Sequence, residues 1–342
     1  MPLRHDFRNR PPQQVRVVVF GATGYIGRFV VKELVGRGYQ VVAFTRACSG
    51  IGGTQDRDQV IRDFPGAEVR FGDVTDAASI ASNAFDQPAD VVVSCLASRT
   101  GGRRDSWAID HAATLNTYRT GREAGVAHYV LLSAICVQKP LLEFQKAKLA
   151  FEAVLQADTE MTHSIVRPTA FFKSLGGQVE SCRKGSPYVM FSGGELARCK
   201  PISEADLARF IADCLDDQDK INKVLPIGGP GQALSAREQG IMLFQALGRR
   251  QRLLSVPIAL MNGPIALLDA LSRLFPAVQD TAEFGKIGRY YATESMLVWD
   301  HQRQCYDADA TPSYGEDTLE QFFQRVARDG MDGQELGDAA LF

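Results

Sequence analysis

The most constraining feature of this chain is a short apolar run that ends in evenly spaced glycines. Residues 15–20 (VRVVVF) are typical of a buried strand, and glycines follow at positions 21, 24 and 27. A strand that turns through glycines into a helix brings backbone N–H groups to the positively polarised helix N-terminus, where phosphates bind. The turn therefore predicts a dinucleotide site, and a purely structural turn is the alternative. The predicted contacts are Gly21, Thr23, Gly24, Tyr25, Ile26 and Gly27.

Strand and helix patterns alternate from residue 15 onward, which predicts βαβ units and a parallel sheet. Further strands are expected at residues 39–45, 69–76 (with the following loop), 91–98, 129–133 and 161–167. The expected fold class is α/β, a Rossmann-type doubly wound parallel sheet with a smaller C-terminal substrate-binding lobe. We expect a disordered arm at residues 1–14 and the nucleotide-binding domain at 15–170. Residues 171–342 are expected to be mainly the substrate lobe, with some segments returning to the Rossmann core.

The composition argues against several classes of partner. A net charge of −2 gives no electrostatic support for nucleic-acid binding. The seven cysteines contain no Cys-x-x-Cys pair, which favours a reducing compartment and argues against a metal site or an iron–sulfur cluster. Residues 1–14 lack the apolar core of a signal peptide, so we expect a cytoplasmic protein.

The most apolar stretch runs from Leu253 to Phe275. It carries two prolines and two charged residues, so a membrane-spanning helix is not expected. Ordinary core is the simplest interpretation. The alternatives are an apolar substrate wall and a peripheral contact with a membrane surface.

The end of the second expected strand predicts the type of cofactor. Arg46 stands where enzymes that prefer NAD usually carry an acidic residue on the ribose 2′-hydroxyl. A cation there suits a 2′-phosphate, so we expect NADPH. Asp73 and Val74 resemble an Asp-Val pair that contacts adenine in short-chain dehydrogenase/reductase (SDR) enzymes. Ala97 and Ser98 follow the fourth strand, where the backbone of such enzymes passes the cofactor.

The segment after the fifth strand departs from the ordinary SDR pattern. Those enzymes carry Tyr-x-x-x-Lys, in which the tyrosine is the acid and the lysine holds the ribose. This chain has Phe144-x-x-x-Lys148, and Ile135 occupies the usual place of the catalytic serine, two residues after Ser133. Phenylalanine cannot protonate a carbonyl oxygen, so reduction of a ketone by the standard route is disfavoured. The pattern favours an activated C=C bond as hydride acceptor, or a fold that binds NADPH without catalysis.

Other residues near this segment are further candidates. Lys148 is expected to bind the ribose, and Lys146 is a candidate substrate contact or a solvated helix lysine. Residues 167–169 resemble the Arg-Pro segment that passes the nicotinamide in extended SDR enzymes. The aromatic residues that follow would face a flat apolar substrate or fill the interface between lobes. The remaining candidates are Ser133, Arg167, Pro168 and Thr169 on the cofactor, and Phe171, Phe172 and Tyr188 on the substrate.

Taken together, residues 131–152 (LLSAICVQKPLLEFQKAKLAFE), the opening GATGYIGRFVVKELV and the run RPTAFFKSLGGQ resemble the NADPH-dependent divinyl chlorophyllide 8-vinyl-reductases, a family of atypical SDR enzymes. The resemblance extends over about residues 15–299. It implies a tetrapyrrole substrate, divinyl chlorophyllide or protochlorophyllide, whose 8-vinyl group becomes ethyl. Phe144 fits this reaction because a vinyl group has no oxygen to protonate. The alternatives are an isoflavone-reductase-like enzyme acting on a small aromatic substrate, and a non-catalytic NADP-binding regulator or assembly factor.

Overall fold

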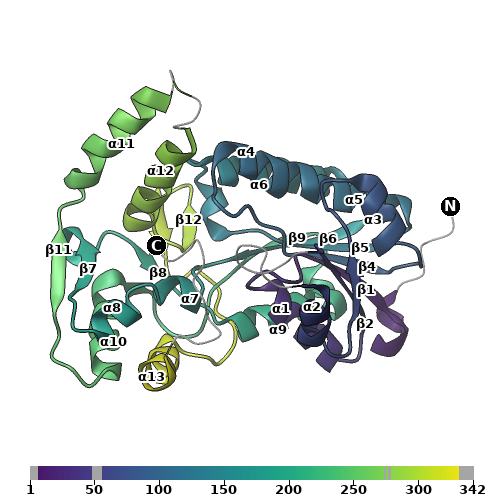
Figure 1. Cartoon of the computed structure of the whole chain (residues 1–342), viewed down its shortest axis with the longest axis horizontal. Coiled ribbons are helices and arrows are strands. Elements are labelled where there is room, and N and C mark those ends of the chain that lie inside the picture. Colours follow the sequence, from purple (N-terminus) through teal and green to yellow (C-terminus); the bar gives the residue numbers. More distant parts are fainter. Residues whose placement is uncertain (1–6, 48–55, 273–274, 276–278, 331–342) are drawn as a thin grey trace.

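A computed structural model of the chain describes residues 7–47, 56–272, 275 and 279–330 (Figure 1). Its centre is a seven-stranded sheet in which every neighbouring pair is parallel, in the order β3-β2-β1-β4-β5-β6-β9. This is the strand order of a doubly wound dinucleotide-binding fold, extended by one strand, and it confirms the predicted fold class. The strands are β1 (Arg16–Phe20), β2 (Gln40–Thr45), β3 (Glu68–Phe71), β4 (Val91–Ser94), β5 (His128–Leu132), β6 (Thr162–Pro168) and β9 (Lys223–Ile227).

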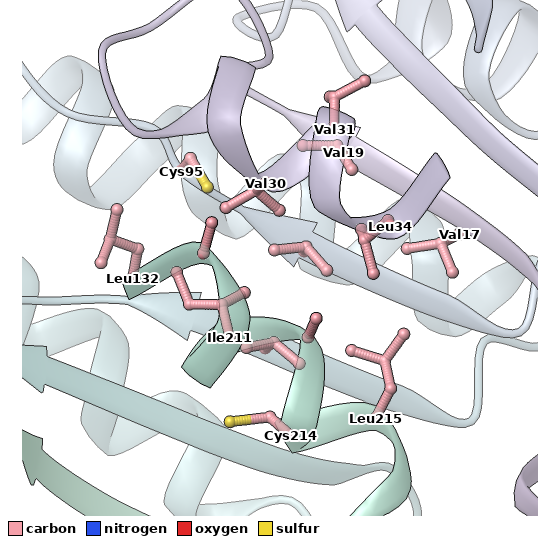
Figure 2. Close-up of a cluster of buried hydrophobic side chains, with 14 of the residues drawn as sticks. Val17, Val19, Val30, Val31, Leu34, Cys95, Leu132, Ile211, Cys214 and Leu215 are labelled. Atoms are coloured by element: carbon pink, nitrogen blue, oxygen red, sulfur yellow. The ribbon is translucent and has the colours of Figure 1, made fainter. Parts of the chain in front are cut away.

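Helices cover both faces of the sheet, which explains why its central strands are apolar throughout. Helix α1 (Gly27–Gly36) packs on one face together with α9 (Glu204–Asp216) and α2 (Arg57–Asp63). In Figure 2, Val30 and Leu34 of α1 and Ile211 and Leu215 of α9 approach the same face of the sheet. The other face carries α3 (Ala77–Ala84), α5 (Thr114–Glu123) and α6 (Glu143–Ala157).

Two elements from beyond residue 170 belong to this core. Strand β9 pairs with β6 along residues 164–168, and α9 contributes seven buried apolar side chains to the same hydrophobic cluster as α1. The seventh strand is therefore added only after the chain has formed part of the C-terminal region and returned to the sheet. Both elements come from residues 171–342, the range in which the sequence led us to expect some returning segments.

The prediction of a disordered arm is wrong for residues 7–14. They form two short 3₁₀ turns, η1 (Phe7–Asn9) and η2 (Pro12–Gln14). The ring of Phe7 is buried beside His128, with 6.2 Å between ring centroids. Burying this ring contributes about 1.5–3 kcal/mol. The segment is further held by an ion pair from Arg10 to Asp90 and by the Gln40 side chain, which donates to the Gln13 carbonyl at 2.6 Å. Residues 1–6 lie outside the described residues.

The rest of the C-terminal region forms a separate body at the left of Figure 1. Its main core joins α8, β7, α10 and α13, and a smaller cluster joins α12 to the start of α6. Ser235 caps α10 with Glu238, as its capping-box sequence predicts. The elements are α7 (Phe172–Leu175), α8 (Val179–Arg183), β7 (Tyr188–Phe191), β8 (Arg198–Cys199), β10 (Leu234–Ser235), α10 (Ala236–Ala246), β11 (Leu253–Val256), α11 (Ala259–Ser272), α12 (Gln279–Thr293), β12 (Val298–Asp300), β13 (Cys305–Asp307) and α13 (Leu319–Asp329).

The apolar stretch from Leu253 is not ordinary core. It forms β11 and then α11, whose Leu260 and Leu267 are 65% and 62% exposed, and Ile265 is the residue of α11 that is buried. Helix α11 packs on α12 and otherwise projects from the upper left of the molecule (Figure 1). Among the described residues, no helix is both long and apolar enough to cross a membrane.

Candidate active site

The glycine turn after β1 has the geometry that its sequence predicts. Gly21 has a φ of +74°, and a Cβ there would lie 2.7 Å from the carbonyl carbon of Cys95. A Cβ on Gly27 would lie 2.1 Å from the Gly21 oxygen, so α1 can approach the turn only with glycine at this position. Gly24 donates its amide to the Gly21 carbonyl at 2.9 Å. The turn is thus a bare backbone cradle at a helix N-terminus, and such a cradle suits a pyrophosphate.

Tyr25 links this turn to the segment after β6. Its ring centroid lies 6.2 Å from that of Phe171, and the Lys173 ammonium stands 4.4 Å from the ring centroid. The Tyr25 hydroxyl is buried and has no hydrogen-bond partner among the residues described. Thr23 is half-buried. The side chain of Ile26 is buried in the core, so Ile26 would contact a cofactor through its backbone. Two predicted site segments therefore meet here.

The residues predicted to bind the adenosine half lie at the ends of neighbouring strands. Arg46 directly follows β2 and is exposed. Asp73 is also exposed, and the amide and hydroxyl of Thr75, each at 2.8 Å, lower the pKa of its carboxyl, with a further contribution from Arg46. Val74 is half-buried against the core. Arg46 and Asp73 are therefore close enough to act on one ligand.

Lys148 is buried on α6 and forms an ion pair that the sequence did not indicate. Its Nζ lies 3.0 Å from Oδ1 of Asp110, and the amide of Ser98 donates to the same oxygen at 3.3 Å. Asp110 belongs to η4 (Trp107–Ala113), a π-helical segment between α4 (Arg103–Ser106) and α5. Burial raises the pKa of Cys95 to about 12, against a lowering contribution from Lys148. Because Cys95 also touches Gly21, the glycine turn and Lys148 flank the same strand end.

A second buried cluster lies one helical turn further along α6. Glu152 is fully buried and accepts a hydrogen bond from the Ser133 hydroxyl at 2.5 Å. Its two oxygens also bind the guanidinium of Arg167, from Nε at 3.2 Å and from Nη2. The side chains of Ser133 and Arg167 are thus engaged with the protein itself. Glu152 carried no motif, although its spacing of four from Lys148 on a helix places both on one face.

Lys146 and Phe144 differ in environment from Lys148. Lys146 is 48% exposed, and its ammonium lies 2.8 Å from Glu143. Burial alone would raise the pKa of Glu143, but Lys146 and the indole N–H of Trp107 at 3.1 Å hold that pKa below its usual value. Phe144 is partly buried against the cluster that joins α6 to α12. Lys146 therefore lies at the solvent-exposed edge of the predicted site. Position 144 carries a phenylalanine, so it supplies no acid in place of the usual tyrosine.

The segment after β6 is held by backbone pairing. Pro168 ends β6 and is buried, and Thr169 donates its amide to Ile227 at 2.9 Å and its hydroxyl to the Lys200 carbonyl. Ala97 is exposed beside Ser98 at the end of β4. Pro168 and Ala97 both lie at the carboxyl ends of strands, the edge where open parallel sheets bind ligands.

Two predicted substrate contacts are corrected. Phe172 is 2% exposed and packs on Phe322, with 5.6 Å between ring centroids. Tyr188 is 6% exposed and belongs to the same core cluster of the C-terminal region. Both are core residues, because this region needs large apolar side chains to pack its short helices. Phe171, which is half-buried against Tyr25, remains at the boundary.

The described part of the chain contains no group of three or more His, Cys, Asp or Glu side chains placed to hold a metal ion. The residues present fit a nicotinamide dinucleotide instead. The glycines at 21 and 27 let the turn form at the N-terminus of α1, because a Cβ at either position would clash with neighbouring backbone. Two buried polar atoms of the predicted site, the Tyr25 hydroxyl and Oδ2 of Asp110, lack a partner among the described residues.

The match to a family model defines the class of protein. Residues 21–218 match the NAD(P)H-binding family, so the chain is a member of this class. Among solved structures, the NADPH complex of the Escherichia coli quinone oxidoreductase QOR2 is similar with a TM-score of 0.61 and 17% identity. That similarity covers 91% of this chain and 99% of that chain, and it shows the fold alone.

Closer relatives define the particular family. The chain is 58% identical over 341 residues to the chloroplastic divinyl chlorophyllide a 8-vinyl-reductase of Oryza sativa subsp. indica, covering 98% of this chain and 84% of that protein. The Arabidopsis thaliana protein of the same name is 57% identical over 342 residues, covering 97% and 82%. The chain belongs to the divinyl chlorophyllide a 8-vinyl-reductase family, as its sequence motifs predict.

Proposed function

We propose that this chain reduces the 8-vinyl group of 3,8-divinyl chlorophyllide a, or of its protochlorophyllide counterpart, to an ethyl group with NADPH. The observation that carries the proposal is the N-terminal half of α6. It retains a buried Lys148 but presents Phe144 where an enzyme acting on a carbonyl needs an acid. The high identity to named vinyl reductases over nearly the whole chain supports the same substrate.

In the proposed mechanism, some residues of the site bind the cofactor and others orient it toward the substrate. When bound, NADPH would supply the hydride for the outer vinyl carbon, and the adjacent carbon would take a proton from water or an acidic side chain. The glycine turn would hold the pyrophosphate at the N-terminus of α1. Lys148 would orient the ribose of the nicotinamide half, and the backbone after β4 and β6 would line the nicotinamide. Phe144 and Phe171 would exclude water, which favours transfer of a hydride to carbon.

The choice of NADPH over NADH rests on Arg46. Its guanidinium is exposed at the end of β2, where the 2′-phosphate of the adenosine ribose is expected. Replacing Arg46 with alanine should lower kcat/KM for NADPH about 10- to 100-fold, because a charge-assisted hydrogen bond is lost. Activity with NADH should hardly change. Equal losses with both cofactors would contradict this role.

The proposed activity is tested by anaerobic incubation with divinyl chlorophyllide a and NADPH. The expected product is heavier by two hydrogens and shows a shifted Soret band. Protochlorophyllide, assayed in parallel, gives the preference between the two substrates. Tight binding of NADPH without any product from either tetrapyrrole would reject the proposal and favour a non-catalytic NADP-binding role. Turnover of small aromatic substrates alone would favour the isoflavone-reductase-like alternative.

A peripheral membrane contact is part of the proposal and rests on α11. Its exposed leucines, with Phe275 at 56% exposure beyond the helix end, form an apolar face. The acidic Asp269 in α11 is neutralised by Lys286 of α12 at 2.5 Å. We expect the protein to co-migrate with lipid vesicles in a flotation assay, and a Leu260→Glu/Leu267→Glu variant to stay in solution while retaining activity on dissolved substrate. The plant relatives are named as chloroplastic, and a cytoplasmic location for this chain stays a prediction.

A further inference from the structure

Asp110 carries a buried carboxylate oxygen that finds no hydrogen-bond donor in the described part of the chain. The residue is 2% exposed. Its Oδ1 accepts from the Ser98 amide and lies 3.0 Å from the Lys148 ammonium, whereas Oδ2 has no partner. An unsatisfied buried acceptor is costly, and such atoms in proteins usually have a reason. The open oxygen therefore indicates a donor that arrives with a ligand.

The location of Asp110 supports a ligand. It lies in the π-helical segment η4, which packs on α6, and π-helical turns are rare and often found at functional sites. Ser98, bonded to the same carboxylate, follows the carboxyl end of β4. The carboxyl edge of an open parallel sheet is where ligands bind in this type of fold. The open oxygen is thus part of the site rather than of the distant core.

Lys148 and Asp110 also form a chemically specific pair. The ammonium offers three N–H donors and the carboxylate has an unused acceptor oxygen beside it. Two adjacent hydroxyls complement this pattern, because one can accept from the lysine while the other donates to the aspartate. A ribose has such adjacent hydroxyls, whereas a planar tetrapyrrole ring has none.

We propose that Asp110 binds the cofactor directly, its Oδ2 accepting a hydrogen bond from one hydroxyl of the nicotinamide-side ribose while Lys148 donates to the other. Asp110 thereby also holds Lys148 in position. The inference rests on the proposed function only in taking NADPH as the ligand, and it does not depend on which substrate is reduced.

The test compares two ligands that differ by the nicotinamide half. NADPH and adenosine 2′,5′-bisphosphate are titrated against the wild type and Asp110→Asn, with binding followed by calorimetry. The variant should bind NADPH about 10- to 100-fold more weakly, the loss expected for one charge-assisted hydrogen bond. It should bind the bisphosphate as the wild type does, because that fragment lacks the second ribose.

Asp158→Asn is the matched control. Asp158 caps the C-terminal end of α6, the helix that carries Lys148, and its carboxylate accepts from Tyr118 at 2.6 Å and from the Glu160 amide at 2.7 Å. It should bind both ligands normally. If Asp110→Asn weakens both ligands equally, or neither, Asp110 has only a structural role and the proposal is overturned.

A ligand-side experiment covers the case in which Asp110→Asn fails to fold. The wild type is titrated with an NADPH analogue whose nicotinamide ribose lacks both the 2′- and 3′-hydroxyls. The analogue should bind at least as weakly as NADPH binds to the variant, and equal binding of analogue and NADPH would overturn the proposal. Failure of the wild type to reduce divinyl chlorophyllide would reject the proposed function but leave these binding results unaffected.

Discussion

Two buried ionic clusters lie one turn apart on α6, and they differ in whether their hydrogen bonding is complete. At Glu152 both carboxylate oxygens are bonded, by Ser133 and by Arg167. At Asp110 one oxygen is bonded by Lys148 and Ser98, and the other is open. A buried cluster that is satisfied within the protein stabilises one arrangement of the chain. By the inference drawn above, the cluster with the unpaired acceptor is completed by the cofactor.

This difference separates structural from functional polar groups in one small region. Glu152 ties β5 to β6 through its partners, and so fixes the strand ends that the cofactor would pass. Asp110 instead connects the end of β4 to α6 through a lysine that faces the predicted cofactor. The sequence predicted cofactor contacts for Ser133 and Arg167, and those contacts stay predictions. Their side chains already have protein partners.

The largest effect is expected from breaking the complete cluster. Glu152→Ala leaves the guanidinium of Arg167 without its buried partner and should lower the free energy of unfolding by about 3–5 kcal/mol. Denaturant unfolding of the cofactor-free protein measures this change. Glu152→Gln, which keeps the shape of the side chain, should cost less. A loss of NADPH binding with unchanged stability would show that Glu152 belongs to the ligand site and would remove the contrast.

The incomplete cluster should respond more in activity than in stability. Lys148→Arg keeps a positive charge beside Asp110, so no buried charge is left unpaired. The free energy of unfolding should fall by about 1–3 kcal/mol, the cost of fitting a larger side chain into a packed interior. The different shape and donor geometry of the guanidinium should misplace the ribose and lower kcat/KM about 100-fold. Steady-state kinetics beside thermal melting separates the two quantities. A variant as active as the wild type would show that Lys148 does not orient the cofactor.

A third buried carboxylate, that of Glu204, should make the stability of the protein depend on pH. Glu204, at the start of α9, is buried, and burial raises the pKa of its carboxyl above 4.5, while the amide of Lys173 opposes this effect. Because the folded protein holds this proton more tightly than the unfolded chain, the associated stability is present below pH 4.5. It is lost as the pH rises through the folded-state pKa.

Glu204→Gln should remove the loss of stability that accompanies ionisation of this carboxyl at higher pH. Its Tm relative to the wild type should therefore increase between pH 4 and pH 8, as measured by calorimetry at several pH values. A constant difference in Tm across this range would mean that Glu204 ionises normally in the folded protein.

The smallest effect is expected at the exposed lysine. Lys146 pairs with Glu143 at the rim, and a helical pair of this spacing contributes about 0.2–0.5 kcal/mol to stability. Lys146→Ala should therefore leave unfolding nearly unchanged. If Lys146 contacts the substrate, KM for the tetrapyrrole should rise severalfold while the Kd for NADPH stays constant. An unchanged KM would show that Lys146 is a solvated helix lysine, the alternative interpretation of its sequence position.

Several features could be predicted because they depend on neighbours in sequence. The apolar runs, the three glycines and the spacing from Phe144 to Lys148 predicted the parallel sheet, its nucleotide-binding turn and the helix that carries the site. The left-handed turn at Gly21 and the close backbone approach at Gly27 follow from the glycine spacing, since the demands of a tight turn and close packing are local. The capping box at Ser235 was predictable for the same reason.

The remaining features were decided by tertiary structure. Asp110 pairs with Lys148, and Glu152 pairs with Arg167. The fold brings these residues together from different elements, so their spacing in the sequence does not predict the pairs. The burial of Phe172 and the exposure of Leu260 depend on which elements pack beside them, and hydrophobicity alone does not distinguish these outcomes. The sequence by itself determined the class of fold, the cofactor-binding turn and the missing acid, because each depends on patterns of neighbouring residues. Which polar groups are completed by the protein and which are left for a ligand was decided only when distant segments came together.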